Sequence, residues 1–400
     1  MVLRPQRLSI TIVALLAAAS ALGPSAMQIL LPALPLIRTD FGIPASLAQL
    51  TLSLSMLSIA VATLTYGPLS DRFGRKPILL IGIGITSLGS LLCYLAPTIQ
   101  LLIVGRIIQA FGGAVGLVVA RAIARDVYGP SESAQIISTL VMVMVVIPML
   151  SPALGGELMS RFGWRSVFIF IGLFSLAMLV ISILRLPETL HEPAALKGLS
   201  GMLSTFVDLL KSRVFRGYAF CVAFVSVVFF SFISAAPEIM VSVLHRPATE
   251  YGYYFIMVPA GFMAGNYVSR RFGNRIEIKN LISLGSKISL VGISIALILY
   301  LAGMRHPASL FVPISIAIFG NGVTLPNAQA GAINEFPKNA GSASGLTGFL
   351  QMGLSAAAAQ LVAVLFNGSA YPMLILMLIA SFFSLVSFQY GSRHPAENQD

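Results

Sequence analysis

Long apolar runs recur along the whole chain, and short polar segments separate them. Each run has about twenty residues, the length that a helix needs to cross a hydrocarbon core about 30 Å thick. The pattern therefore predicts twelve membrane-spanning helices. They lie at residues 8–31, 46–69, 77–97, 99–121, 134–158, 165–186, 215–242, 251–270, 280–303, 309–333, 341–366 and 371–391.

The composition supports an all-α membrane protein. Of the 400 residues, 57% are hydrophobic and 10% are charged, whereas soluble globular proteins have about 25% charged residues. The two cysteines, Cys93 and Cys221, fall inside predicted spans. The sequence has no spaced His/Cys cluster, no nucleophile motif and no phosphate-binding glycine loop. We therefore expect neither an enzyme nor a metal or cofactor site.

The net charge of +11 is better explained by membrane topology than by a nucleic-acid site. With a cytoplasmic N-terminus, 18 of the 25 Lys and Arg lie on the cytoplasmic side, five lie on the outer side, and two lie deep within spans (Arg106 and Lys287). Basic residues collect on the cytoplasmic side of membrane proteins. Both termini are therefore expected in the cytoplasm. The first 26 residues could instead be a secretory signal, but removing them would invert every later loop.

The longest polar break divides the spans into two groups of six. We predict an N-terminal bundle at 1–187, a cytoplasmic linker at 188–213 and a C-terminal bundle at 214–400. Apolar residues at helical spacing in the linker predict an amphipathic helix on the inner leaflet, with a plain linker as the alternative. LSDRFGRK at 69–76 is echoed by VSRRFGNR at 268–275. Such repeats are typical of transporters whose substrate site lies between two halves.

The polar loop between the second and third spans reads YGPLSDRFGRKP, from Tyr66 to Pro77. Its glycines permit a tight turn, and its basic side chains suit an anionic inner leaflet. Asp71 lies at the C-terminus of a helix, where the helix dipole disfavours an anion. We therefore expect a compensating partner for Asp71. The residues of this predicted gating loop are Gly67, Asp71, Arg72, Gly74, Arg75 and Lys76.

This loop resembles the signature Gly-x-Leu-x-Asp-Arg-x-Gly-Arg-Lys of the major facilitator superfamily. GRIIQAFGG, which contains Arg106, Gln109, Gly112 and Gly113, resembles a second signature of that superfamily. Shorter segments are similar to the bicyclomycin/chloramphenicol-resistance branch of its drug/proton antiporters. These segments are LPALP, RDVYG, LPET, YGYYF and EFPKNAGSASGLTGFLQ.

The resemblance covers the whole chain and implies twelve helices in two pseudo-symmetric six-helix bundles, the major facilitator fold. In that superfamily the loop aspartate holds the cytoplasmic face closed, partly through the N-terminus of helix 11. Here that terminus would lie near Gly341 to Ala343.

The segment IPMLSPALGGEL, from Ile147 to Leu158, resembles the signature of the exporters in this superfamily. Pro148 and Pro152 loosen the helix because each removes a backbone donor. Gly155 and Gly156 allow neighbouring helices to pack closely. The resemblance therefore implies export rather than uptake.

One position departs from the resembled branch. Helix 1 there usually carries an aspartate before the ALP segment, but this chain has Gln28 in SAMQILLPALP. A glutamine amide does not titrate, so the usual proton carrier and counter-charge for Arg106 are missing. Arg106 could shift a neighbouring pKa, bind an anionic substrate group, or hold helix 4 to helix 1 through Gln28 and backbone carbonyls.

Two acids are candidates for the missing proton carrier. Glu238 follows Pro237 in helix 7, and helices 1, 4, 7 and 10 line the cavity in the resembled superfamily. Glu238 is therefore expected at a depth similar to that of Arg106, with an interfacial carboxylate as the alternative. Glu157, at the end of helix 5, is the second candidate, and its alternative is a surface position.

Amides beside helix interruptions are candidates for the cavity wall: Asn321 and Asn327 in helix 10, and Gln351 in helix 11. We predict a monomeric exporter of small amphipathic compounds that is coupled to protons and works by alternating access in the bilayer. Two alternatives stay open. One is a dedicated exporter of an endogenous metabolite such as a siderophore, and the other is an uncoupled facilitator.

Overall fold

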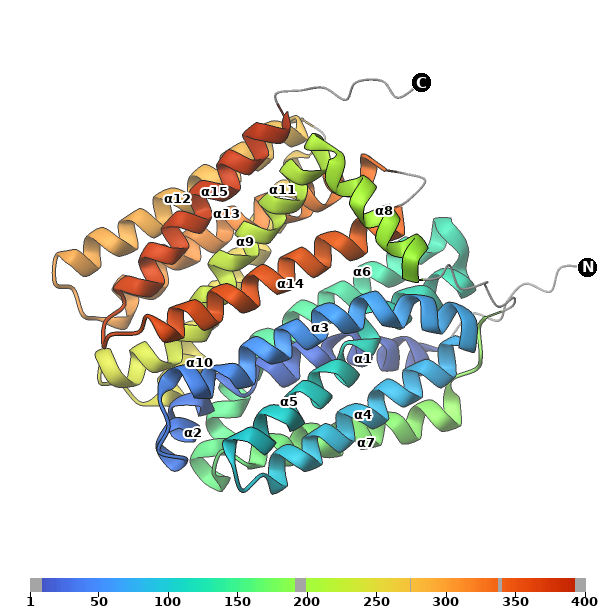
Figure 1. Ribbon diagram of the computed structural model, residues 1–400, viewed down its shortest axis with the longest axis horizontal. Helices are drawn as coiled ribbons and strands as arrows, with labels where there is room; N and C mark the ends of the chain where they lie inside the picture. Colours follow the sequence, from blue (N-terminus) through green and yellow to red (C-terminus); the bar gives the residue numbers. More distant parts are fainter. Residues whose placement is uncertain (1–8, 191–198, 274, 337–339, 393–400) are drawn as a thin grey trace, which may run out of the picture. The chain divides into compact units, whose positions relative to one another are not determined.

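The computed structural model describes residues 9–190, 199–273, 275–336 and 340–392. Helices form almost all of this part of the chain, and no strand occurs in it. The chain divides into two compact units, Met1–Leu196 and Lys197–Asp400. In Figure 1 each unit is a bundle of long helices. The boundaries predicted at 187 and 213 stay a prediction.

The first unit contains seven α-helices and one short 3-10 helix in its described part. They are α1 (Ile10–Gln28), η1 (Leu31–Ala33), α2 (Leu34–Asp40), α3 (Ala45–Phe73), α4 (Arg75–Leu95), α5 (Ile99–Gly113), α6 (Val115–Phe162) and α7 (Ser166–Arg185).

The second unit contains eight α-helices and one π-helical turn in its described part. They are α8 (Leu199–Lys211), α9 (Arg213–Glu238), η2 (Ile239–Val243), α10 (Ala248–Phe255), α11 (Met257–Phe272), α12 (Ile278–Leu301), α13 (Pro307–Asn334), α14 (Ala340–Val364) and α15 (Tyr371–Ser392).

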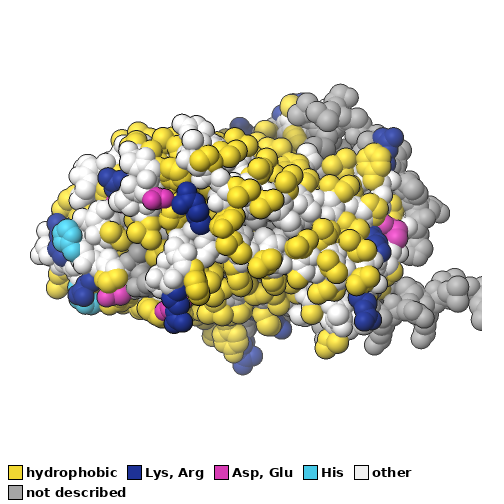
Figure 2. All heavy atoms as spheres, turned by 90° about the horizontal axis from the view of Figure 1, so that it is seen from below, with side chains coloured by type: hydrophobic (Ala, Val, Ile, Leu, Met, Phe, Trp, Pro, Cys, Tyr) yellow, Lys and Arg dark blue, Asp and Glu magenta, His cyan; other side chains and the backbone are white. Residues whose placement is uncertain are grey.

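Eleven helical segments of the described chain are long and apolar enough to cross a membrane. The twelfth predicted span, at 251–270, corresponds to α10 and α11, which are separated at Ile256. Two glycines of α11, Gly261 and Gly265, lie against the backbone of α13 at Ser315 and Phe319. The chain is therefore a multi-pass all-α membrane protein, and its eighth span is a broken helix. Figure 2 shows that hydrophobic side chains cover most of one face.

The fourth and fifth predicted spans share the long helix α6. Gly116, near its start, packs against the Ala19 carbonyl of α1, and Gly155 packs against the carbonyl of Ile29, which caps α1. Ten residues of α1 measure about 15 Å, whereas a straight helix from Gly116 to Gly155 would measure about 58 Å. The helical path of α6 therefore turns back between the candidate spans 99–128 and 142–162. This return agrees with two separate spans.

Small residues bring α1 close to its neighbours in the first unit. A Cβ on Gly113 would lie 2.9 Å from the Cα of Gly23, and one on Gly23 would lie 2.8 Å from the Gly113 carbonyl oxygen. Only glycines allow the backbones of α1 and α5 to meet in this way. This contact fixes the position of α1 beside Arg106, which lies two turns earlier on α5.

The helix predicted in the linker is α8. Leu209 is 1% exposed, and it packs with Phe206 and Leu210 into a core formed with α9, α13 and α14. These apolar residues therefore cover protein, whereas the sequence predicts that they face the inner leaflet. The reason is that α8 is followed at once by α9, whose Phe215 offers an apolar surface one turn away.

Candidate functional site

Arg106 lies in the interior of the first unit, with 1% of its surface exposed. Its Nη1 donates a 2.9 Å hydrogen bond to the Ala26 carbonyl of α1 and another hydrogen bond to Oε1 of Gln109. Its Nε lies 3.5 Å from the Thr51 carbonyl of α3. One guanidinium therefore links α1, α3 and α5. Such bonding offsets much of the cost of burying a cation.

Gln109 extends this network to a fourth helix. Its Nε2 donates a 2.8 Å hydrogen bond to Oγ of Ser90 on α4, and Ser90 donates to the Thr86 carbonyl. Ser55 of α3 in turn donates to the Arg106 carbonyl at 3.4 Å. The side chain of Arg106 thus holds neighbouring helices together through neutral acceptors.

Gln28 lies near this site, but within the described chain it forms no hydrogen bond with Arg106. It is 9% exposed, and its Oε1 is buried without a hydrogen-bond partner. Among the described residues no carboxylate pairs with Arg106. Of the three roles considered for Arg106, the contacts favour the positioning of helix 1. That contact uses the carbonyl of Ala26 rather than the amide of Gln28.

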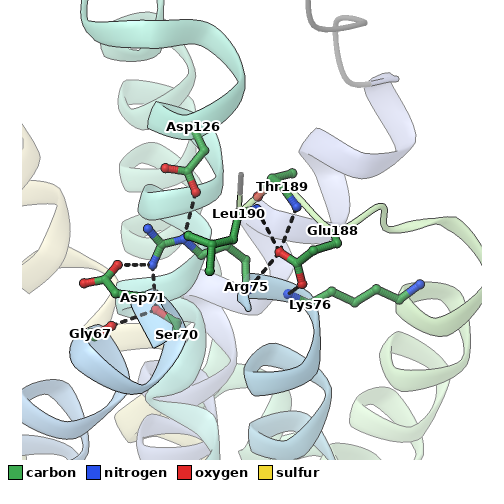
Figure 3. Close-up of polar contacts among 9 residues, drawn as sticks. All are labelled: Gly67, Ser70, Asp71, Arg75, Lys76, Asp126, Glu188, Thr189 and Leu190. Atoms are coloured by element: carbon green, nitrogen blue, oxygen red, sulfur yellow. Dashed lines mark hydrogen bonds and ion pairs between the residues drawn. The ribbon is translucent and has the colours of Figure 1, made fainter. Parts of the chain in front are cut away.

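The loop between α3 and α4 carries a network of charges, drawn in Figure 3. Asp71 pairs with Nη1 of Arg75 at 2.5 Å, and Nε of Arg75 donates to Asp126 of α6 at 2.7 Å. The same Nη1 donates to Oγ of Ser70, which itself donates to the Gly67 carbonyl. Asp71 therefore has the compensating partner expected from its position at a helix C-terminus.

Glu188 fixes the segment after α7 to the same loop. Its carboxylate accepts hydrogen bonds from four backbone N–H groups, those of Arg75 and Lys76 at the start of α4 and those of Thr189 and Leu190. Partial burial by itself would raise the pKa of Glu188, but these four donors favour the charged form and lower the pKa below its ordinary value of 4.5. The negative carboxylate therefore lies at the N-terminus of α4, where the helix dipole is positive.

The other residues of the predicted gating loop have separate roles. Gly74 has a φ of +101°, and a Cβ there would lie 2.6 Å from Oε2 of Glu188. A side chain is therefore excluded at Gly74 by both conformation and space. Lys76 donates from Nζ to the Ile183 carbonyl of α7 at 3.1 Å, while Arg72 is exposed and lies over the Phe73 ring.

The sequence predicts no partner for Glu188 or Asp126, although both lie in segments that resemble the drug/proton antiporters. The signal was present in LPET and RDVYG. The partners of Glu188 are backbone N–H groups, which every residue but proline has. The role of Asp71 toward residues 341–343 stays a prediction, because those residues belong to the second unit.

The segment from Ile147 to Leu158, which resembles the exporter signature, lies in the second half of α6, after the helical path turns back. Pro148, Pro152, Gly155 and Gly156 are buried, and the helix continues through both prolines. A Cβ on Gly155 would overlap the carbonyl oxygen of Ile29. Gly155 therefore provides the close helix packing that the sequence predicts for this segment.

The two acids proposed as proton carriers differ in their surroundings. Glu157 pairs with Arg161 at 3.4 Å, and its side chain is 46% exposed. Glu238 is half-buried and ends α9, where the chain changes to the π-helical turn η2. Oγ of Ser242 donates to Oε1 of Glu238 at 2.5 Å. The surroundings of Glu157 favour its surface alternative.

The predicted cavity amides all form hydrogen bonds within the second unit. Asn321 is buried and donates to the Val225 carbonyl of α9 at 3.2 Å. Asn327 donates to Oγ of Ser269 on α11 at 2.7 Å. Gln329 donates to Gln351 across α13 and α14 at 3.2 Å. These bonds bring Gln351 beside α13, and they leave Asn321 as a contact between α9 and α13.

Groups able to hold a metal ion are absent from the part of the chain that the structure describes: no three His, Cys, Asp or Glu side chains gather there. Cys93 and Cys221 are free and buried. Cys93 points to the Leu102 carbonyl, and Cys221 lies 3.4 Å from Ser384. Both thiols take part in helix packing.

Comparison with known proteins gives consistent results. The sequence profile described as Major Facilitator Superfamily matches residues 14–360. The chain is 30% identical to the uncharacterized MFS-type transporter YdgK of Bacillus subtilis, over 94% of this chain and 93% of that one. It is 26% identical to a bicyclomycin resistance protein homolog of Haemophilus influenzae, over 93% of both chains.

A crystal structure of similar fold is that of a bacterial homolog of the human lysosomal transporter Spinster, in an inward-facing, unoccupied conformation. The TM-score is 0.75 at 17% identity, and the match covers 96% of this chain and 98% of that one. At this identity the likeness shows the fold alone.

Proposed function

Because the chain belongs to the Major Facilitator Superfamily, whose members are membrane transporters, we propose that it exports small amphipathic compounds across the bacterial inner membrane in exchange for protons. The observation that carries export is the segment from Ile147 to Leu158. It resembles the signature of exporters, and its Gly155 packs against the carbonyl that caps α1. The relative named for bicyclomycin resistance supports the same substrate class.

We place the coupling proton on Glu238. Its carboxylate lies at the junction of α9 and a π-helical turn, directly after Pro237. Turns of this kind often mark functional sites, because they loosen the regular helical hydrogen bonds. Because the carboxylate is half-buried, it has access both to water and to a substrate. Arg106 has a different role in this proposal, since it positions α1 within the first bundle.

The orientation and partners follow from the charge distribution. Both termini are placed in the cytoplasm because most of the 25 Lys and Arg then lie on that side. The partners are the small-molecule substrate, protons and the bilayer, with no nucleic acid. The transporter is proposed to act as a monomer, with the two bundles exposing the substrate site alternately to the two sides.

The proposal is tested in inverted membrane vesicles with an acidic lumen and a pH-sensitive dye. Candidate compounds, lipophilic cations and neutral amphiphiles, are added to wild type, Glu238→Gln and the matched control Glu250→Gln. Antiport predicts alkalinisation of the lumen with wild type and Glu250→Gln, and its loss with Glu238→Gln. A full response with Glu238→Gln would exclude that residue as the carrier.

One observation favours a second function, an uncoupled facilitator. Helix α1 carries the buried amide of Gln28 where the resembled branch has an acid, and an amide cannot carry a proton. The same vesicles distinguish the two functions. Uptake of a labelled compound without any change in lumenal pH would establish facilitation and exclude antiport.

A further inference from the structure

Helices α9 and α15 of the second unit cross at two glycines, and a pocket lies beside the crossing. A Cβ on Gly217 would lie 2.5 Å from the Cα of Gly391, so the two backbones are in contact. The pocket has a volume of about 270 Å³. Its lining residues are Arg216, Gly217, Phe220, Val386, Ser387 and Tyr390. Figure 1 shows α9 beside α15.

The end of the pocket near the start of α9 is cationic. Within the described chain no carboxylate pairs with Arg216, and its Nε is buried without a hydrogen-bond partner. The guanidinium of Arg213 lies 4.1 Å from the centroid of the Tyr390 ring, which holds this second cation beside α15. Arginine has a planar set of donors that matches a phosphate group. This end of the pocket therefore suits an anion.

The pocket continues along the two helices as an aromatic surface. Phe220 contacts Phe224, with ring centroids 6.4 Å apart, and Phe224 stacks on Phe383 at 5.6 Å. Phe383 and Val386 are exposed. Arg213 and Arg216 lie in the first turn of α9, whereas Phe220 and Phe224 lie two and three turns after Arg213, further into a candidate span. A matching ligand has an anionic group at the helix end and an apolar chain directed toward the bilayer centre.

We propose that this pocket binds an anionic phospholipid, with its phosphate on Arg216 and Arg213 and an acyl chain along Phe224 and Phe383. Basic pockets between transmembrane helices at the cytoplasmic side are known to bind anionic headgroups. The assignment to the inner leaflet rests on the orientation given under the proposed function. The binding itself depends on neither export nor proton coupling, so the two proposals fail independently.

The test uses the purified full-length protein in detergent and counts bound lipid by native mass spectrometry. Phosphatidylglycerol, phosphatidylcholine and inorganic phosphate are titrated into wild type, Arg216→Gln and Arg270→Gln. Arg270 is an exposed arginine in the last turn of α11 and serves as the matched control. We expect phosphatidylglycerol to bind at least about fivefold more weakly to Arg216→Gln than to the control. Phosphatidylcholine should bind weakly to all three proteins.

Two further variants keep the test decisive if Arg216→Gln does not fold. Arg216→Lys keeps the charge and should retain the preference for phosphatidylglycerol, whereas Tyr390→Leu removes the ring under Arg213 and should weaken it. Equal binding of phosphatidylglycerol to Arg216→Gln and Arg270→Gln would overturn the proposal. Displacement of the lipid by millimolar inorganic phosphate would also overturn it, because the site would then bind small anions rather than phospholipid.

Discussion

Oε1 of Glu188 accepts a 2.9 Å hydrogen bond from the backbone N–H of Arg75, a residue 113 positions earlier in the chain. The same carboxylate reaches the N–H of Lys76 through Oε2. It therefore satisfies two of the N–H groups that the start of α4 leaves without helical partners. Since Arg75 also contacts Asp71 and Asp126, the carboxylate joins the chain after α7 to the charge network of the loop.

Replacement of Glu188 should destabilise the first unit. Glu188→Ala removes an anionic cap at a helix N-terminus, and we expect a loss of about 1 to 2 kcal/mol in the free energy of unfolding. Thermal unfolding in detergent measures the effect. Glu277→Ala is the matched control, because Glu277 precedes α12 without forming a side-chain cap. Equal melting temperatures for the two variants would contradict the role of Glu188 as a cap.

The stabilisation by Glu188 should depend on pH in a defined direction. Its pKa in the folded protein lies below the ordinary value of 4.5, so folding favours the carboxylate. The contribution is complete above the pKa of the unfolded chain and is lost as pH falls through the lower folded pKa. The difference in melting temperature between wild type and Glu188→Ala should thus be constant from pH 7 to about 5 and shrink below about 4.5. A decrease of this difference in melting temperature between pH 6 and 8 would show that another titrating group causes the effect.

Gly155→Ala should separate α6 from α1. The new Cβ would overlap the Ile29 carbonyl oxygen, and overpacking of this kind costs about 1 to 3 kcal/mol. Export by the variant should fall together with its thermal stability. Gly84→Ala is the control, since a Cβ there meets no atom within 4 Å, and it should leave both measurements unchanged. If Gly155→Ala had the same thermal stability as wild type, α6 could move away from α1 without a loss of stability, and the prediction would be wrong.

Arg106→Lys tests whether this residue positions helices or binds substrate. A lysine has no planar fork, so it cannot reproduce the bonds to Ala26, Gln109 and Thr51 together. We expect a loss of about 1 to 3 kcal/mol in stability and a similar reduction in transport for anionic and neutral compounds. A substrate-binding arginine would give another result: unchanged stability with a selective loss of anionic compounds. Parallel melting and transport measurements separate the two.

Much of the fold could be predicted from the sequence, because the length and hydropathy of each run are local properties. Eleven of the twelve predicted spans are helices that meet both criteria. The eighth span is divided near Ile256, where Gly261 and Gly265 let α11 lie against α13. The apolar face of α8 could be predicted, but its burial against Phe215 could not.

The sequence by itself determined the membrane-spanning segments and the family, and it predicted that Asp71 needs a compensating partner. Arg75 is four residues away along the chain, so local geometry suffices for that pair. Only the tertiary structure decided the partners of Arg106 and Glu188. Their main partners are the Ala26 carbonyl and the backbone N–H groups of α4. Backbone groups are nearly the same in every residue, so the sequence does not mark which of them a distant side chain will reach. The packing of the helices makes that choice.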